Sequence, residues 1–227
     1  MMNPELLKLA EEAAQCRRCG LCERRRSVVF GEGNPNAPLV LVGEGPGEEE
    51  DKTGRPFVGR AGRLLDQALA DCGLDRSHVY ICNTVKCRAA DWSTGKPMNR
   101  PPTEEESQAC RHWLFPQLEA IGPEVILCIG APSAKNLIKK DFKITKERGQ
   151  VFRDGFPKPM IATLHPAYIL RQSSQTNDGG YSLLVADIAK AWRGAVKLRE
   201  KKVQSFAPDG PDSPPDAPLQ LPLFDAD

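Results

Sequence analysis

The chain has 227 residues, a formal net charge of +1 and 40% hydrophobic residues. Its length and the even spread of its apolar segments favour one large domain over two small ones. No apolar run approaches the ~20 residues of a membrane helix, which excludes a membrane-spanning function. The N-terminus lacks the basic and apolar segments of an export signal, so we expect a cytoplasmic protein.

Charge is distributed unevenly along the chain. Five aspartates and no lysine or arginine follow residue 204, so the residues before them carry a net charge of +6. A basic body suits a polyanionic partner, although so small an excess does not by itself identify one.

Hydrophobic periodicity predicts helices that alternate with apolar strands. The expected helices cover residues 3–14, 61–72, 103–120, 132–140 and 181–201. The expected strands cover residues 27–30, 39–43, 79–83, 124–130 and 160–164, with an edge hairpin at 151–156. Residues 88–102 lack periodicity and are rich in proline, which predicts a long loop. This alternation predicts an α/β fold of three layers, α/β/α, around a central, mostly parallel four-stranded sheet.

The apolar run at 39–43 ends in a glycine-rich, acidic loop. A ligand can lie against the backbone of this loop, because Gly43, Gly45 and Gly47 carry no side chain. A phosphate-binding loop is excluded, because no Gly-Lys-Ser/Thr follows, and Glu48 stands where a dinucleotide fingerprint needs glycine. The remaining alternative is an acidic surface loop without a function, although loops this rich in glycine and acidic residues usually carry function.

The cysteines predict a metal centre. The chain contains eight of them, and in a reducing compartment they indicate thiols or metal ligands rather than disulfides. Cys16-x-x-Cys19 is a chelating pair, and Cys87 and Cys110 flank the long loop. Four thiolates can hold zinc or a four-iron cluster, and spacing alone favours zinc. Cys22 is an alternative to Cys19, whereas three other cysteines lie in apolar patterns typical of core thiols: Cys72, Cys82 and Cys128.

Residues 43–51 and 54–59 resemble the first motif of the uracil-DNA glycosylase superfamily, most closely that of its family 4 enzymes. A second motif of that superfamily is matched by the segment His165-Pro-Ala-Tyr-Ile-Leu-Arg171, which resembles it throughout this context. The resemblance extends from Cys16 to Arg171. It implies a monofunctional glycosylase that flips uracil out of DNA and hydrolyses its N-glycosidic bond to start base-excision repair.

The resemblance also implies roles for individual residues. Phe57 would stack on the uracil, Asn83 would read its edge, and His165 would donate a hydrogen bond to the carbonyl beside the broken bond. The best-known uracil glycosylases have an aspartate at the position of Gly45, so we expect Glu44 to position the attacking water here. They exclude thymine with a tyrosine at the position of Gly47, and Glu50 is a candidate for that task. DNA contacts are expected from Tyr168, Leu170 and Arg171, which would otherwise begin a packed helix.

Family 4 enzymes hold a [4Fe–4S] cluster, and the resemblance assigns its ligands to Cys16, Cys19, Cys87 and Cys110. The loop between the last two is longer here than is usual in the family. A related branch captures uracil covalently through a histidine in this region, and residues 95–100 contain none, so turnover is expected.

The C-terminal segment is expected to stand apart from the domain, which we place at residues 1–203. Residues 204–227 are rich in Pro, Asp, Gly and Ser, so we expect a disordered tail. Within the tail, residues 220–224 resemble the peptide by which bacterial repair proteins bind the sliding clamp, through Gln220, Leu221, Leu223 and Phe224. The alternative is an apolar terminus without a partner. We expect a monomer.

Two other functions fit the same residues less well. One is a DNA- or clamp-associated iron–sulfur binding module without catalysis, and the other is a zinc-stabilised nucleotide-binding protein.

Overall fold

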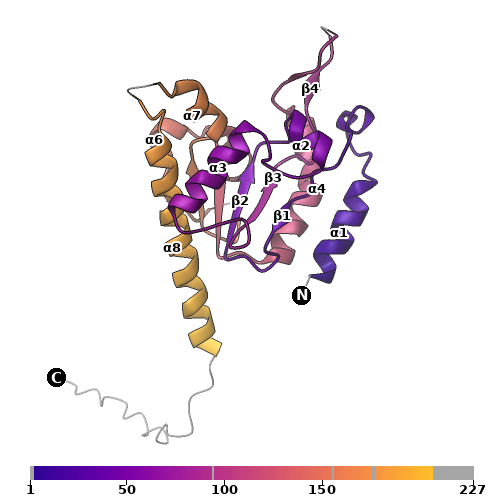
Figure 1. Cartoon of the computed structure of the whole chain (residues 1–227). Coiled ribbons are helices and arrows are strands. Elements are labelled where there is room, and N and C mark those ends of the chain that lie inside the picture. Colours follow the sequence, from indigo (N-terminus) through magenta and orange to yellow (C-terminus); the bar gives the residue numbers. More distant parts are fainter. Residues whose placement is uncertain (1–2, 94, 155, 175–176, 207–227) are drawn as a thin grey trace, which may run out of the picture.

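The computed structural model describes residues 3–93, 95–154, 156–174 and 177–206. In these residues a sheet lies between two layers of helices (Figure 1). Its strands lie in the order β1-β3-β2-β6-β8-β7. They are β1 (Glu32–Gly33), β2 (Leu39–Gly43), β3 (Tyr80–Asn83), β6 (Val125–Ile129), β7 (Val151–Phe152) and β8 (Met160–Thr163). The four middle strands are parallel, and β1 and β7 add short antiparallel edges. The predicted α/β fold with a parallel four-stranded centre is therefore confirmed.

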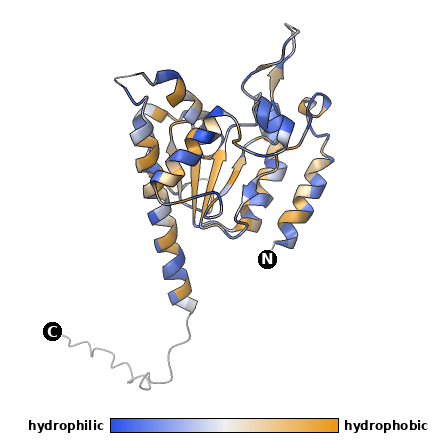
Figure 2. Ribbon diagram, viewed as in Figure 1, coloured by the Kyte–Doolittle hydropathy of each residue, from blue (hydrophilic) through white to orange (hydrophobic). Residues whose placement is uncertain are grey.

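Alternate residues of the strands pack into two separate cores. Val40, Val42 and Cys82 face one core, and Leu39, Leu41 and Ile81 face the other. The strands are apolar on both faces because each face is covered (Figure 2). The first core is covered by α1 (Pro4–Ala14), α4 (Glu104–Ile121) and α5 (Ala131–Leu137). The second is covered by α3 (Arg60–Asp71), α7 (Pro166–Gln172) and α8 (Tyr181–Phe206).

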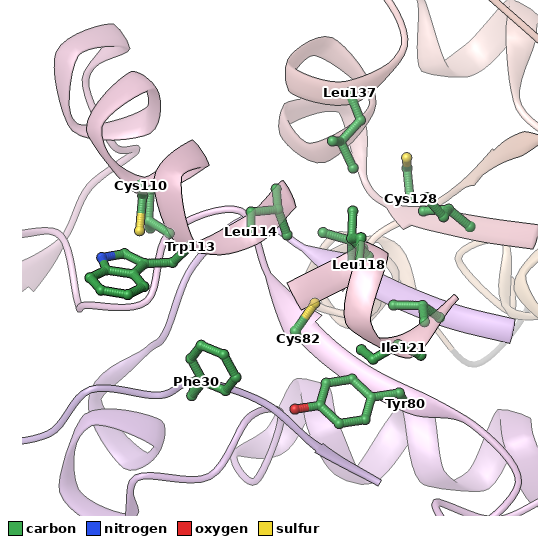
Figure 3. Close-up of a cluster of buried hydrophobic side chains, with 14 of the residues drawn as sticks. Phe30, Tyr80, Cys82, Cys110, Trp113, Leu114, Leu118, Ile121, Cys128 and Leu137 are labelled. Atoms are coloured by element: carbon green, nitrogen blue, oxygen red, sulfur yellow. The ribbon is translucent and has the colours of Figure 1, made fainter. Parts of the chain in front are cut away.

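The first core includes two of the cysteines assigned to the protein interior. Figure 3 shows Cys82 and Cys128 among the apolar side chains between α4 and the sheet, and both are fully buried. Cys110 and Trp113 lie at one end of this core, on the same helix. All eight cysteines belong to the described residues, and none of them forms a disulfide.

Local sequence signals fix the helix ends. The side chain of Asn3 accepts hydrogen bonds from the backbone N–H groups of Glu5 and Leu6 at the start of α1. Thr103 and Glu106 form the capping box that opens α4. The last helix runs to Phe206, past the expected residue 201, and its final turns project beyond the sheet in Figure 1.

Several local predictions are wrong. Residues 27–30 form no strand, because the bond from Val29 N–H goes to the carbonyl of Lys86, past the end of β3, and is not continued as a ladder in the described residues. The predicted loop 88–102 contains an antiparallel hairpin of β4 (Ala90–Asp91) and β5 (Met98–Asn99). The sequence also gave no signal for the short helices α2 (Glu48–Thr53), α6 (Ile144–Glu147) and η1 (Gly20–Glu23).

The parallel strands bring their carboxyl ends to one edge of the sheet. Gly43 ends β2, Asn83 ends β3, Gly130 follows β6, and His165 follows β8 by two residues. Open α/β sheets bind ligands at this edge. No helix in the described ranges is long and apolar enough to cross a membrane. The expected clamp-binding peptide, Gln220 to Phe224, lies outside the described residues.

Candidate active site

A cleft of about 920 Å³ opens at the carboxyl edge of the sheet. Most of the residues expected from the sequence line it: Glu44, Gly45, Gly47, Glu50, Phe57, Asn83, His165, Tyr168 and Arg171. Gly43 lies beneath Phe57 and Asn83 rather than in the wall. Leu170, on α7, is half-buried and does not line the cleft.

Phe57 and Asn83 meet over Gly43. A Cβ atom at position 43 would collide with Oδ1 of Asn83 and lie 2.6 Å from Cζ of Phe57, so only glycine allows this approach. Asn83 is 1% exposed, and its Oδ1 has no hydrogen-bond partner among the described residues. An unpaired buried amide oxygen costs free energy, which a ligand with an N–H donor would recover.

Phe57 is held in an unusual backbone conformation. Its φ is 52°, in the left-handed region that side chains such as phenylalanine rarely adopt. The guanidinium of Arg76 donates to the carbonyls of Pro56 and Phe57, and it also forms ion pairs with Glu32 and Asp66. The contacts of Arg76 therefore hold Phe57 in this strained conformation, with its ring over the floor of the cleft.

His165 stands across from Phe57. The two ring centroids are 5.9 Å apart, and the planes are tilted by 30°. Nδ1 of His165 accepts the backbone N–H of Ala167 at the start of α7, so the neutral ring carries its proton on Nε2. Burial, together with the nearby charge of Arg171 and against the smaller opposing effect of Glu50, lowers the pKa of His165 to about 4. At neutral pH this residue is an uncharged hydrogen-bond donor.

The carboxylate of Glu44 lines the cleft without a hydrogen bond to any described residue. Burial raises the pKa of Glu44 above its usual range. The backbone carbonyl of Glu44 already accepts Oγ1 of Thr84 at 2.6 Å and N–H of Val85 at 3.1 Å. The carbonyl of Gly43 accepts N–H of Thr84. The carboxylate is thus a freer acceptor for a water than either carbonyl.

The carboxylate of Glu50 organises the glycine-rich loop by binding backbone N–H groups. Its carboxylate accepts the N–H groups of Gly47, Val58 and Gly59 at 2.9 to 3.0 Å. These contacts tie the glycine loop to the segment that carries Phe57. The other acidic side chains of this run also have partners. Asp51 accepts the N–H groups of residues 26 and 27, and Glu48 and Glu49 form ion pairs with Lys52.

Five cysteines line a second hollow, between α1, α4 and the segment after β3: Cys16, Cys19, Cys22, Cys87 and Cys110. Three of the sulfurs accept an N–H group. The donors are Nε1 of Trp113 to Cys16 at 3.1 Å, N of Lys86 to Cys110 at 3.2 Å, and Nη1 of Arg25 to Cys87 at 3.5 Å. Such donors stabilise charge on sulfur, so the hollow suits a thiolate-bound group.

Within the described residues, which include every cysteine, no three His, Cys, Asp or Glu side chains are placed to hold one metal ion. A zinc ion needs its four sulfurs at about 2.3 Å from one point. A four-iron cluster is larger, and its ligand sulfurs therefore stand farther apart. The predicted ligands Cys16, Cys19, Cys87 and Cys110 lie around this hollow, and so does the alternative, Cys22.

Sequence reasoning missed two residues that build the site. Arg76 locks the backbone of Phe57, and Lys86 lies buried between Asn83 and the cysteine hollow. Nothing in the sequence marked Arg76, because its acceptors are mainly backbone carbonyls and distant acids. A lysine between Val85 and Cys87, directly after a buried strand, was a usable signal for Lys86.

Comparison with known proteins gives consistent matches. The profile of the uracil DNA glycosylase superfamily matches residues 30–189. A type-4 uracil-DNA glycosylase of Thermotoga maritima is 48% identical over 172 residues, covering 75% of this chain and 86% of that protein. The type-4 enzyme of Archaeoglobus fulgidus is 43% identical over 169 residues, covering 71% and 81%. That of Sulfurisphaera tokodaii is 42% identical over 173 residues, covering 73% and 76%.

Proposed function

This chain belongs to the uracil DNA glycosylase superfamily, and we propose that it removes uracil from DNA to start base-excision repair. It is a monofunctional glycosylase, which hydrolyses the N-glycosidic bond without cleaving the strand. The observation that carries this proposal is the unpaired, buried amide of Asn83 facing a cleft between Phe57 and His165.

Uracil enters the cleft only as an extruded base, because its glycosidic bond is inaccessible inside a duplex. The ring of Phe57 provides a flat apolar surface for the base. Oδ1 of Asn83 accepts the N3–H of uracil, and its amide nitrogen donates to the neighbouring carbonyl. Cytosine presents an acceptor where uracil presents N3–H, so it would leave Oδ1 unpaired in the same position.

Breaking the bond leaves negative charge on the uracil and positive character on the sugar. Neutral His165 donates its Nε2–H to the carbonyl beside the broken bond, where that charge accumulates. Glu44 holds the attacking water on the sugar side, because its carboxylate is partly buried and has no described partner. Glu50 acts indirectly, because its carboxylate holds the backbone of the segment that carries Phe57. By fixing the shape of this loop, Glu50 would also help to exclude thymine.

The second hollow holds a [4Fe–4S] cluster in this proposal, with Cys16, Cys19, Cys87 and Cys110 as ligands. The bound cluster supplies a cross-link between three distant segments. The residues of the chain provide the N–H donors of Trp113, Lys86 and Arg25 to its sulfur ligands. No step of the reaction needs an electron, so the role is structural.

We also infer the surroundings in which the protein acts. Its substrate is uracil-containing DNA, and we expect the protein to act in the cytoplasm. All residues of the cleft come from one chain, which suits action as a monomer. Tyr168 and Arg171 of α7 line the cleft and would contact the strand beside the uracil. The tail residues Gln220, Leu221, Leu223 and Phe224 would tether the enzyme to the sliding clamp.

Incubation with a uracil-containing oligonucleotide, followed by alkali treatment of abasic sites, tests the activity. We expect strand breaks at uracil, no breaks without alkali, and a loss of at least ~100-fold in the excision rate for His165→Ser. Equal activity of the variant would refute the mechanism. DNA binding without excision by the unaltered protein would instead identify a non-catalytic binding module.

A further inference from the structure

We propose that the β4–β5 hairpin is a DNA-binding element in which Trp92 stacks on an unpaired base next to the extruded nucleotide. This inference rests on the proposed function and adds a contact that favours single-stranded substrate. It concerns residues 90–93 and 95–99, which project from the fold near α2 (Figure 1).

The hairpin is continuous with the wall of the cleft. Ala89, Asn99 and Arg100, at the base of the hairpin, line the same cleft as Phe57 and His165. Nδ2 of Asn99 would lie 3.5 Å from a Cβ atom built on Gly47, so the hairpin touches the glycine loop. A strand that delivers its uracil to this cleft therefore passes close to the hairpin.

The base of the hairpin is firmly anchored. Nε of Arg88 donates to Oδ1 of Asn99 at 2.7 Å, and N–H of Arg100 donates to the carbonyl of Ala89. The guanidinium of Arg100 forms two hydrogen bonds with the carboxylate of Glu106 in α4, at 2.7 and 2.8 Å. These contacts use the two basic side chains at the base to fix the position of the hairpin, so they are not available for phosphates.

The outer part of the hairpin exposes large apolar side chains. Trp92 is 39% exposed and Met98 is 64% exposed. The guanidinium carbon of Arg24 lies 5.2 Å from the centroid of the Trp92 ring, so one part of the indole is covered by a cation. Tyr168 of α7, which is 41% exposed, lines the same cleft. The cleft thus has an exposed aromatic side chain on α7 and another on the adjoining hairpin.

These features fit single-stranded DNA better than a protein partner. Aromatic rings with adjacent arginines bind unpaired bases by stacking while the cation meets the phosphate backbone. The indole of Trp92 with the charge of Arg24 has this composition, and the base of its hairpin lines the cleft. In a duplex the neighbouring bases remain paired with the other strand and stacked on one another, so stacking on Trp92 gains less free energy.

Steady-state kinetics of the full chain with its cluster test the proposal. The variants are Trp92→Ala, Trp92→Phe and Met98→Ala, with Leu183→Ala as a matched control. Leu183 is 41% exposed on α8 and does not line the cleft. For a single-stranded oligonucleotide with one uracil, we expect Trp92→Ala to raise KM about tenfold with kcat within twofold. Trp92→Phe should retain most of the affinity, and the increase should be smaller on duplex DNA.

A second readout is independent of excision. Titration of a uracil-free single strand should quench tryptophan fluorescence in the unaltered protein and quench it much less in Trp92→Phe. An unchanged KM in Trp92→Ala, together with equal quenching of the unaltered protein and Trp92→Phe, would overturn the proposal. If the unaltered protein still excises uracil, the proposed glycosylase function is unaffected by that result. This would also be the result if Trp92 and Met98 received a protein partner. If excision is absent but the quenching differs, the proposed function fails and the hairpin contact stands.

Discussion

The ammonium group of Lys86 donates to the backbone carbonyl of Asn83 at 3.0 Å, while the backbone N–H of Lys86 donates to the sulfur of Cys110 at 3.2 Å. One buried residue therefore connects the backbone of Asn83 to the cysteine hollow. Lys86 is 1% exposed, and its Nζ has no carboxylate within 4 Å among the described residues. A buried cation without a counter-charge is costly. The thiolates of a bound cluster would supply the missing negative charge.

Lys86→Met should destabilise the protein. The change keeps most of the side-chain volume but leaves the carbonyl of Asn83 and Oε1 of Gln117 without their donor. We expect the free energy of unfolding to fall by about 2–3 kcal/mol, measured by urea denaturation of the cluster-loaded protein. Lys8→Met is the control, because the Lys8 side chain is 78% exposed and its ion pair with Glu12 is 4.0 Å long. Equal stability of the two variants would contradict the role given to Lys86.

Gly43→Ala should lower activity more than stability. The new methyl group collides with Oδ1 of Asn83 and the ring of Phe57, so the two residues that hold the base must move apart. We expect kcat/KM for uracil excision to fall on the order of 100-fold. Gly194→Ala serves as the control, since its nearest neighbour would be Cγ2 of Val125 at an ordinary 4.0 Å. Activity within twofold of the unaltered enzyme would show that the close packing at Gly43 is not needed.

The central strands could be predicted from the sequence because their apolar runs are local and continuous. The segment 27–30 has a similar apolar run, but its bond from Val29 to Lys86 lies past the end of β3 and is not continued as a ladder in the described residues. The hairpin at 90–99 was missed for a related reason. Its stem has only two paired residues on each side, and it is fixed by Arg88 and by the ion pair of Arg100 with Glu106.

The candidate site was predictable to the extent that its chemistry lies in motif side chains. Phe57, Asn83 and His165 were expected from the sequence, and the structure places all three in one cleft. The supporting contacts were not predictable, because they involve the backbone. Glu50 accepts N–H groups, and Arg76 donates to carbonyls. Such groups carry no sequence signal, so their partners become visible only in three dimensions.

The pH profile of excision should lack an inflection near 6.5. His165 donates through Nε2 in its neutral form, and its pKa is lowered to about 4, chiefly by burial. Protonation of His165 therefore removes activity only when the pH falls through that low value. Glu44 must be ionised to hold the water, and burial raises its pKa, so the first decline on acidification belongs to Glu44.

Glu44→Gln tests this assignment. The variant should lose ~100-fold in kcat, and its profile should no longer show the acid limb of Glu44. The measurement is single-turnover excision between pH 4.5 and 8.5, with folding checked by circular dichroism at each pH. An inflection near 6.5 that persists in the variant would mean that His165 titrates in the active range, and that a different tautomer or charge is required.

The cysteine hollow offers a matched pair of residues, because Cys19 and Cys22 both line it and both are half-buried. Their relations to the other sulfurs differ. The pKa of Cys110 is raised mainly by burial and further by the thiolates of Cys19 and Cys16. The pKa of Cys87 is raised to about 12, again mainly by burial and further by Cys110 and Cys19. The charge of Cys19 therefore acts on both Cys87 and Cys110, which supports Cys19 as the fourth ligand.

Cys19→Ala should therefore lose the cluster, and Cys22→Ala should retain it. The measurement is iron per chain in anaerobically purified protein, together with the visible absorbance of a [4Fe–4S] centre, for which we expect about four iron atoms. Cys72→Ala is the outer control, because that thiol contacts the carbonyl of Val185 on α8, away from the hollow. Loss of iron in Cys22→Ala with retention in Cys19→Ala would reverse the ligand assignment. Zinc in place of iron in the unaltered protein would refute the cluster itself.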